Sequence, residues 1–213
     1  MYTPRAFAET DLSALDDLVT RDSFVTLITV DAIGQPYVSH LPILYRRDGA
    51  RVLVEGHWAR PNPQAGHAGD ALMIVHGPHA YVSPSWYPDK EPAARVPTWN
   101  YAVAHLHGTL TPSEDPAVLA DLVARLTERF EPTVGRNWSF EPQRDDHASQ
   151  LRGIIAFRFE PSHIELKFKL SQNHPPTNVE AAITALERAG GETRHEVAAM
   201  MRERLARRPR RQE

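Results

Sequence analysis

The stretch of sequence that decides the fold is HGPHAYVSPSWYPDKEPAARVPTWNY, residues 76–101. Large aromatic side chains alternate here with prolines and small polar residues. Proline cannot donate a hydrogen bond to a sheet ladder, so the prolines from Pro84 to Pro97 predict a shaped loop between strands. Rigid loops with aromatic and small polar groups suit the wall of a flat-ligand site or a subunit interface. We therefore expect this loop to contact a ligand or a second subunit.

Short segments with strand-like composition lie on both sides of the loop. Turn signals separate them, at Asp48-Gly49, Gly77-Pro78 and Pro161-Ser162. The predicted strands are residues 24–30, 37–45, 51–55, 71–75, 79–83, 99–110, 154–159 and 164–170. Strands and helices do not alternate one for one, which argues against a Rossmann sheet and favours an antiparallel barrel.

Helices are expected at the start, middle and end of the chain. Leucines and valines at helical spacing follow a cap at Thr10 or Asp11, and recur over residues 115–130. Two further helices are predicted at 177–189 and 192–207, on either side of Gly190-Gly191, and residues 131–149 are expected to be irregular. The fold class is therefore mainly β with added helices (α+β) and a helical C-terminus.

Composition excludes several classes of protein. The chain has 213 residues, 41% hydrophobic and 24% charged, which is ordinary for a globular protein. It has no cysteine, which excludes disulfides and thiolate metal sites, and its formal net charge of −3 argues against binding of nucleic acid by overall charge. No apolar run is long enough to span a membrane, and the first residues do not resemble a secretion signal. We expect a cytoplasmic protein.

The first candidate for ligand binding is EGHWARPNPQ, residues 55–64. We expect a strand to end here, Gly56 to let the backbone turn, and a short helix to begin at Pro61-Asn62-Pro63. Backbone N–H groups at a helix start can hold a phosphate, with Arg60 as a bidentate cationic clamp. A capped turn facing solvent, with an ordinary surface arginine, explains the pattern equally well.

The second candidate is the segment KFKLSQN, residues 167–173. Strand alternation places Lys167 and Lys169 on one face, and Ser171 continues it. Two cations, a hydroxyl and the following amides suit an anionic group or the edge of a flavin ring. A polar outer strand face is the alternative.

The aromatic loop is the third candidate, because Trp or Tyr can stack on a planar cofactor while Thr98 and Asn100 bind its polar edge. Core packing or a dimer contact is the alternative for each single aromatic residue. His105 and His107 share a strand face, but no carboxylate pattern joins them, so we predict no metal site. No Ser-His-Asp pattern or other catalytic signature is recognisable.

Arginines accumulate at the end of the chain: Arg202, Arg204, Arg207, Arg208, Arg210 and Arg211. Such a tail can bind DNA by phosphate attraction, although the preceding helices lack a distinct helix-turn-helix signature. DNA is therefore a candidate partner.

Three blocks of sequence together resemble the PaiB family of FMN-binding transcriptional regulators. They are Gly56–Pro63, then Gly77–Tyr87 with Val96–Tyr101, then Lys169–Asn173, and Met1-Tyr2-x-Pro4 and Ser39–Pro42 also match. The resemblance runs from the first residue to about residue 190, and the middle block is long and specific.

The resemblance implies an antiparallel split β-barrel of the FMN-binding type, forming a homodimer with FMN between the subunits. It implies a split-barrel domain over residues 1–173 and a helical extension with an Arg-rich tail over residues 174–213. By this resemblance the phosphate and ribityl end of FMN would contact Ser39, His40, Leu41, His57, Trp58, Ala59, Arg60 and Asn62. The flavin ring would be approached by Trp99, Asn100, Lys169, Ser171, Gln172 and Asn173.

The family's name implies negative regulation of transcription. A flavin-dependent oxidoreductase that does not bind DNA is the alternative function, and a haem-binding split barrel is a second alternative because the chain has many histidines. The sequence does not identify a substrate or an electron donor.

Overall fold

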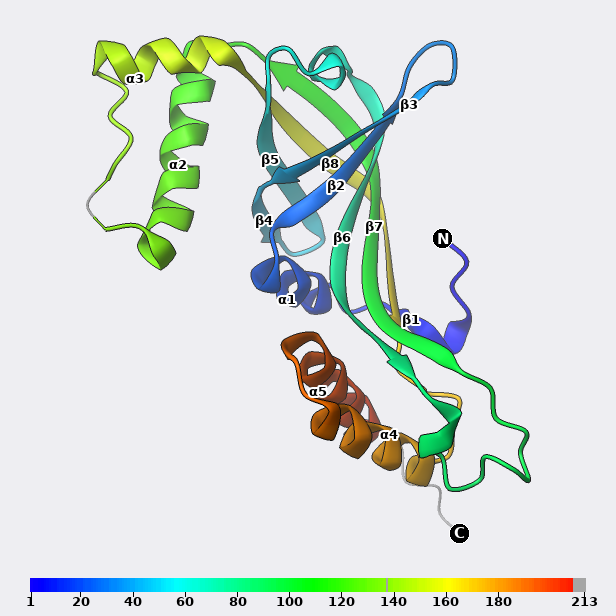
Figure 1. Cartoon of the computed structure of the whole chain (residues 1–213). Helices are drawn as coiled ribbons and strands as arrows, with labels where there is room; N and C mark the ends of the chain where they lie inside the picture. The colour runs from blue at the N-terminus through cyan, green and yellow to red at the C-terminus, as the bar shows by residue number, and fades with distance from the viewer. Residues whose placement is uncertain (137, 209–213) are drawn as a thin grey trace. The chain divides into compact units, whose positions relative to one another are not determined.

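A computed structural model describes residues 1–136 and 138–208. Within these residues an eight-stranded sheet has the order β3-β2-β6-β7-β8-β5-β4, and β1 pairs with β8 (Figure 1). The strands are β1 (Ala8–Glu9), β2 (Phe24–Val30), β3 (Pro36–Pro42), β4 (Leu44–Asp48), β5 (Arg51–Ala59), β6 (Gly69–Val82), β7 (Thr98–Ser113) and β8 (Ile154–Lys169). The pairs β1–β8, β2–β3, β2–β6, β4–β5 and β5–β8 are all antiparallel. The prediction of an antiparallel α+β fold is confirmed.

The chain forms two compact units. Unit 1 comprises Met1–Ala14, His76–Ala104 and Glu165–Glu213, and unit 2 comprises Leu15–Val75 and His105–Ile164. Strands β6, β7 and β8 each contribute residues to both units. The domain boundary predicted after residue 173 stays a prediction.

The helices are α1 (Ser13–Arg21), α2 (Pro116–Val134), α3 (Asp145–Gln150), α4 (Pro176–Ala189) and α5 (Glu192–Ala206). Short 3-10 helices are η1 (Arg5–Phe7), η2 (Pro63–Gly66), η3 (Pro84–Trp86) and η4 (Leu151–Gly153). Helix α3 corrects the expectation that residues 131–149 are irregular throughout. Among the described residues no helix is both long and apolar enough to cross a membrane.

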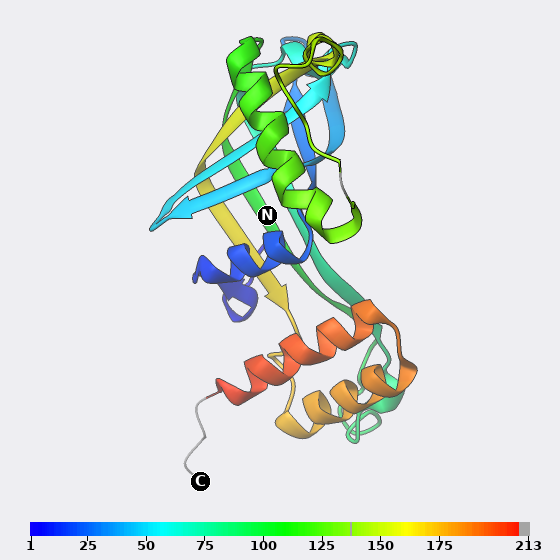
Figure 2. The same cartoon turned by 90° about the vertical axis from the view of Figure 1, so that its left-hand side faces the viewer.

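In unit 2, α2 begins at a strong N-terminal signal. The Asp115 carboxylate accepts a hydrogen bond from the Ala117 N–H at 2.8 Å, and Pro116 occupies the first helical position. Helix α2 (Figure 2) contacts η4. Its leucines at helical spacing belong to a buried cluster that consists of Leu119, Leu122, Leu126, Leu151 and Ala156.

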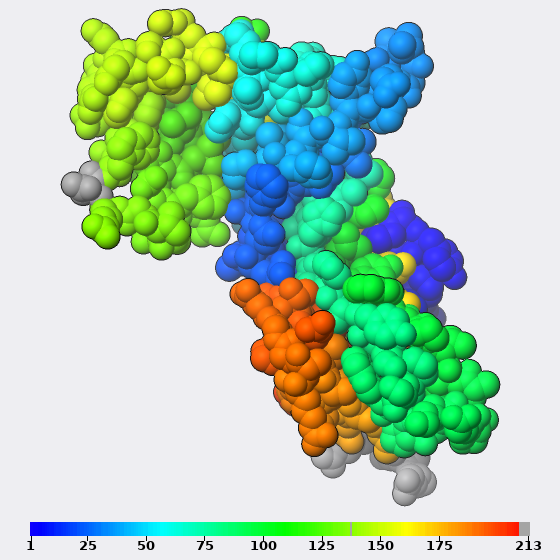
Figure 3. Space-filling model, in the orientation of Figure 1, coloured from blue at the N-terminus to red at the C-terminus, as the bar shows by residue number. Residues whose placement is uncertain are grey.

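In unit 1, α4 and α5 pack against each other. Gly190 and Gly191 join them with φ angles of 67° and 92°, which only glycine adopts without strain. The α4 surface lies beside the segment that carries η3 (Figure 3), and the two elements are in contact. The predicted glycine-linked helical pair is confirmed.

Three predicted breaks in the strands are wrong. β5 continues through Gly56 to Ala59, because glycine is needed there for packing rather than for a turn: a Cβ at Gly56 would lie 2.6 Å from the Phe157 ring. β8 continues through Pro161-Ser162, where β7 presents Gly108 without a side chain.

β6 also continues through Gly77-Pro78. The buried residues there change from odd to even positions, since Gly77 and Pro78 are both buried. Such a change of phase is what one extra residue produces in a strand. The predicted single strand 37–45 is in turn two strands, β3 and β4, separated by buried Ile43.

Candidate functional site

Polar side chains predicted to hold the phosphate end of a ligand meet in unit 2. Elements β3, β5 and η2, which carry them, contact one another. The Asn62 side-chain amide donates to Ser39 Oγ at 2.9 Å, and the Asn62 side-chain oxygen caps η2 by accepting from the Gln64 N–H at 2.9 Å. Ser39 is buried. The sequence prediction therefore grouped two residues that are 23 positions apart in the chain and are hydrogen-bonded in the structure.

Gln64 belongs to this group and ends the EGHWARPNPQ segment, but it was not among the residues predicted to contact FMN. Its side chain is buried, and its amide nitrogen donates to Leu27 O, Thr29 Oγ1 and Tyr37 O. Its side-chain oxygen has no hydrogen-bond partner among the described residues. Its signal in the sequence was an amide side chain at the predicted helix start, two residues after Asn62, which could donate a hydrogen bond.

Arg60 is held by the start of β8 and by a carboxylate. Its Nε donates to Arg152 O at 2.6 Å, one Nη donates to Glu114 at 2.7 Å, and the other donates to Ile154 O at 3.3 Å. The ion pair with Glu114 is exposed, so it contributes little to stability. A phosphate that engaged Arg60 would have to compete with Glu114.

His57, Trp58 and Ala59 lie at the end of β5 rather than in a turn. Burial lowers the pKa of His57, and its Nδ1 is a buried atom without a hydrogen-bond partner among the described residues. The Trp58 side chain is 0% exposed and packs on Phe157, with ring centroids 4.6 Å apart. Trp58 has no surface open to a ligand, whereas Ala59 is exposed.

His40 and Leu41 follow Ser39 along β3. The His40 ring lies 3.1 Å from the Thr26 hydroxyl and stacks on Phe24, and its side chain is on the exposed side of the strand. Leu41 is half-buried. Strand alternation thus gives Ser39 and Leu41 one face and His40 the other.

A second group of predicted residues meets in unit 1. Asn100 and Ser171, both buried, exchange hydrogen bonds: the Asn100 amide donates to Ser171 Oγ at 3.0 Å, and the Ser171 hydroxyl lies 3.3 Å from Asn100 Oδ1. The Asn100 amide also lies 3.2 Å from the sulfur of Met201 in α5. The φ angle of Ser171 is 62°, a left-handed conformation that is uncommon for serine.

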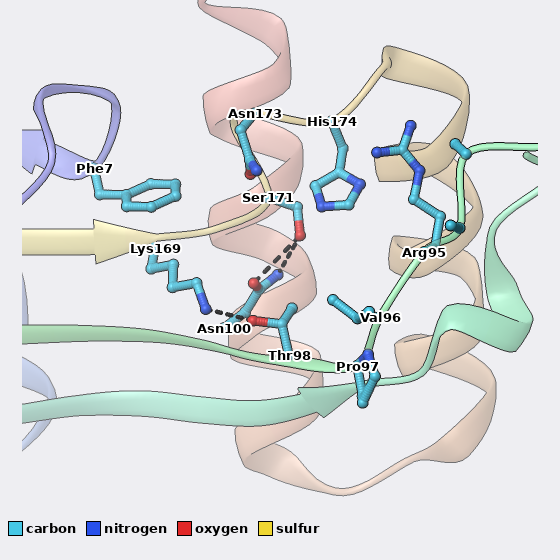
Figure 4. A pocket seen from close by; sticks show the side chains of 12 residues that line it. Phe7, Arg95, Val96, Pro97, Thr98, Asn100, Lys169, Ser171, Asn173 and His174 are labelled. Atoms are coloured by element: carbon cyan, nitrogen blue, oxygen red, sulfur yellow. Dashed lines mark hydrogen bonds between the residues drawn. The ribbon is translucent and has the colours of Figure 1, made fainter. Parts of the chain in front are cut away.

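The two strand lysines have different surroundings. Lys169 donates to the Thr98 hydroxyl (Figure 4). Lys167 is buried, donates to Tyr2 O at 2.9 Å and lies 5.3 Å from the centre of the Tyr101 ring. A solvent-facing row of cations, the alternative that the sequence left open, is excluded for Lys167.

Trp99 and Gln172, two further predicted flavin contacts, are not among the residues that line the pocket of unit 1. Trp99 is 52% exposed and groups with His79 and Tyr81. The Gln172 side chain folds back onto its own chain, accepting from the Leu170 N–H at 2.7 Å and donating to Phe168 O. Gln172 therefore shapes the bend after β8.

The proline-rich loop, residues 84–97, is held in place by Asp89. Its carboxylate accepts from Arg95 Nε at 3.0 Å and from the Asn178 amide of α4 at 2.6 Å. The Arg95 hydrogen bond is the main cause that lowers the pKa of Asp89 to about 2, against 3.8 ordinarily, and Asn178 adds to it. These contacts hold the loop in one conformation against α4 within unit 1.

We expect low pH to loosen this loop, because protonation of Asp89 weakens the contacts that hold it. A carboxylate with a lowered pKa stabilises the folded state fully above pH 3.8, and the contribution is lost as the pH falls through about 2. Amide exchange at Ala93 and Arg95, whose N–H groups bond within the loop, should therefore accelerate between these pH values relative to intrinsic rates. Asp89→Asn should show that acceleration at neutral pH. Asp146→Asn removes a carboxylate of the same lowered pKa in unit 2 and should leave the loop unchanged; equal effects of the two variants would contradict this role of Asp89.

Four of the C-terminal arginines lie within the described residues, and each is engaged inside the protein. Arg202 pairs with Glu187, Arg204 with Glu9 and Arg207 with Glu203. Arg208 donates to the backbone oxygens of His174 and Ser171. Arg210 and Arg211 lie outside the described residues.

Solved structures share the fold at low sequence identity. The flavocytochrome Anf3 of Azotobacter vinelandii is 17% identical with a TM-score of 0.55, over 78% of this chain and 72% of that one. An FAD and haem binding protein of Mycobacterium smegmatis is 18% identical with a TM-score of 0.52, over 76% and 73% of the two chains. The fold is the α+β split barrel that the sequence resemblance implied.

A curated relative matches over nearly the whole length. The protease synthase and sporulation protein PAI 2 of Bacillus subtilis is 29% identical over 219 residues, covering 96% of this chain and 98% of the relative. Residues 1–163 match the model of the family described as "Putative FMN-binding domain". The chain therefore belongs to this PaiB-like family of FMN-binding domains.

Proposed function

We propose that this protein binds FMN and that the polar group of unit 2 holds the phosphate and ribityl end. The observation that carries the proposal is the family match over residues 1–163, which include this whole group. FMN, when bound, supplies electron-transfer chemistry. The chain itself supplies hydrogen-bond donors, orientation and burial.

The side chains of unit 2 fit such a ligand by their chemistry. Ser39 and Asn62 offer a hydroxyl and an amide, and the buried Nδ1 of His57 and Oε1 of Gln64 lack partners among the described residues. An unsatisfied buried polar atom costs about 1–3 kcal/mol, so a polar ligand that reached these atoms would relieve that cost. We leave Trp58 out of the proposed contacts because its side chain is fully covered.

Arg60→Ala should weaken FMN binding about tenfold, because a charge-assisted hydrogen bond to phosphate is lost. Riboflavin, which lacks the phosphate, should bind the variant and the unchanged protein equally. Titration of both flavins, followed by quenching of flavin fluorescence, measures the difference.

Arg152→Ala is the matched control, since Arg152 is also an exposed arginine of unit 2 and only its backbone oxygen contacts Arg60. Its FMN affinity should stay unchanged. An Arg60→Ala protein that still prefers FMN over riboflavin to the original extent would remove Arg60 from the phosphate site.

The sequence-based proposal that Trp99, Asn100, Lys169, Ser171, Gln172 and Asn173 approach the flavin ring stays a separate prediction. Loss of ring-dependent fluorescence changes in Asn100→Ala, with riboflavin as the ligand, would support it. Unchanged binding would remove unit 1 from the flavin site.

A homodimer is part of the proposal. Large apolar side chains remain exposed on β2 and β3: Val30 is 57% exposed and Val38 is 55% exposed, and their positions, paired with Pro36 and Ile28, are neighbours on one face. Exposed apolar residues that lie together commonly mark a protein interface. Sedimentation equilibrium should give twice the protomer mass, and a single protomer mass would contradict the dimer.

A role in transcription is supported by the name of the Bacillus subtilis relative, a sporulation protein. The described C-terminal arginines favour a structural role for this segment, because each already has a partner. Specific DNA binding that survives competitor DNA and falls steeply with salt would support regulation. Its absence would favour a flavin-dependent oxidoreductase without DNA binding.

Haem is the remaining alternative, since two solved structures of this fold are named for flavin together with haem or cytochrome. A Soret band after reconstitution with haem would favour it. Titration with FMN under the same conditions separates the two ligands.

A further inference from the structure

A pocket of about 340 Å³ lies within unit 1, lined by the proline-rich loop and the chain that follows β8 (Figure 4). This volume is at the lower end of the range for small-molecule sites. Its lining residues are Phe7, Ala93, Ala94, Arg95, Val96, Pro97, Thr98, Asn100, Lys169, Ser171, Asn173 and His174. The lining thus combines apolar side chains, among them Phe7, Val96 and Pro97, with polar ones.

The polar side chains of the lining carry positive charge. Lys169 and Arg95 both line the pocket, and none of the twelve described lining residues is an aspartate or glutamate. Lys169 bonds to the Thr98 hydroxyl and forms no ion pair with a described carboxylate. Arg95 uses Nε and one Nη for Asp89, which leaves its second Nη. A half-buried ammonium without a counter-ion favours an anionic ligand.

The ring of His174 lies in the same positively charged surroundings. Its Nδ1 is buried and has no hydrogen-bond partner among the described residues. Burial lowers the pKa of His174, and the positive charges of Arg95, Arg208 and Lys169 lower it further, while Asp89 acts in the opposite direction. Three of the four charged side chains that act on this ring are therefore cations.

The polar groups are held in place before any ligand arrives. Asn100 and Ser171 bond to each other, and Ser171 keeps a left-handed backbone. Arg208 donates to the backbone oxygens of Ser171 at 3.2 Å and His174 at 2.9 Å. Strained, over-determined backbone of this kind is typical of binding sites, because preorganised groups lose little entropy on binding.

We propose that this pocket binds a small organic carboxylate whose charge is recognised by Lys169 and His174 and whose apolar body packs against Phe7 and Val96. The lining offers both cationic and apolar side chains, which favours a carboxylate with a hydrocarbon body over a bare inorganic anion. The site lies in unit 1, apart from the residues assigned above to the phosphate of FMN.

Benzoate tests the proposal, with benzamide as the uncharged analogue of the same shape. Both are titrated into flavin-free protein and followed by NMR of the histidine ring signals. Benzoate should bind, benzamide should not, and the pKa of His174 should rise when benzoate is present. Because no flavin is used, the result does not depend on whether FMN binds.

Lys169→Gln should weaken benzoate binding about tenfold, since a charged hydrogen bond is lost. Lys90→Gln is the matched control, because Lys90 is an exposed lysine of unit 1 outside the pocket lining. Lys169→Arg, which keeps the charge, should restore part of the affinity.

Four results obtained without flavin would overturn the proposal. They are equal binding of benzamide and benzoate, no binding of benzoate, tighter binding of inorganic phosphate than of benzoate, and an unchanged benzoate affinity in Lys169→Gln. Asn100, Lys169, Ser171 and Asn173 line this pocket and are also the residues that the sequence resemblance assigned to the flavin ring, so the two assignments are alternatives. Competitive displacement of benzoate by FMN would assign the pocket to the flavin ring and would overturn the carboxylate proposal.

Discussion

Trp58→Ala is expected to lower the free energy of unfolding by about 3–5 kcal/mol, the usual cost of removing a large aromatic side chain from a core. Trp58 is 0% exposed and packs on Phe157 of β8 with ring centroids 4.6 Å apart. Its removal would leave a cavity between β5 and β8, which pair through Trp58 and Ile155. The structure therefore predicts a loss of stability from a residue that the sequence assigned to the ligand.

Denaturation with urea, followed by far-ultraviolet circular dichroism, measures this loss. Trp58→Phe keeps most of the packing and removes an indole N–H that has no partner among the described residues, so it should cost much less. Trp99→Ala, at a side chain that is 52% exposed, should change stability by less than about 1 kcal/mol. A Trp58→Ala protein of unchanged stability would contradict the buried position.

Gly108→Ala is expected to destabilise unit 2 by about 3 kcal/mol, near the upper end of the usual cost of overpacking. A Cβ at Gly108 would lie 2.3 Å from Glu160 O and 2.6 Å from the Pro161 Cα. Both contacts are with backbone atoms, which cannot move aside as the end of a flexible side chain can. β7 and β8 would have to separate at this point.

Gly153→Ala is the matched control for the same chemical change in the same unit. A Cβ at Gly153 would meet no atom within 4 Å, and its backbone is not in the left-handed region. Its stability should change by less than about 1 kcal/mol, with a small gain from the reduced entropy of the unfolded chain. Equal stabilities of the two variants would rule out the close approach at Gly108.

Elements with a strong local pattern were predictable from the sequence. The β-branched run Phe24–Val30 is β2 with the predicted bounds, and the apolar periodicity that follows Asp115 is α2. In both segments the local preference and the tertiary packing agree, so the pattern of the sequence is sufficient. The same holds for the helical pair joined at Gly190-Gly191.

Glycine and proline were misleading where tertiary packing decides their role. Gly56 is inside a strand because the Phe157 ring lies where a side chain would be, and Pro161 is inside one because β7 presents Gly108 there; both partner residues are far away in the sequence. Nothing local distinguishes such a glycine from one that ends a strand. The wrong break at Gly56 also concealed the position of Trp58, since alternation along β5 is what buries it.

The sequence grouped residues that contact one another within each unit but did not give those contacts. Ser39 with Asn62 in unit 2 and Asn100 with Ser171 in unit 1 are hydrogen-bonded pairs, and their contact with FMN stays a prediction. Arg95 and His174 were missed because each lies in an irregular segment and becomes part of the pocket only through folding.

The central claim is that this chain binds FMN, and equilibrium titration of the purified, flavin-free protein with FMN tests it most directly. The account predicts saturable quenching of flavin fluorescence at one FMN per protomer, with tighter binding of FMN than of riboflavin. Absence of saturable binding, or equal affinity for FMN and riboflavin, would contradict it.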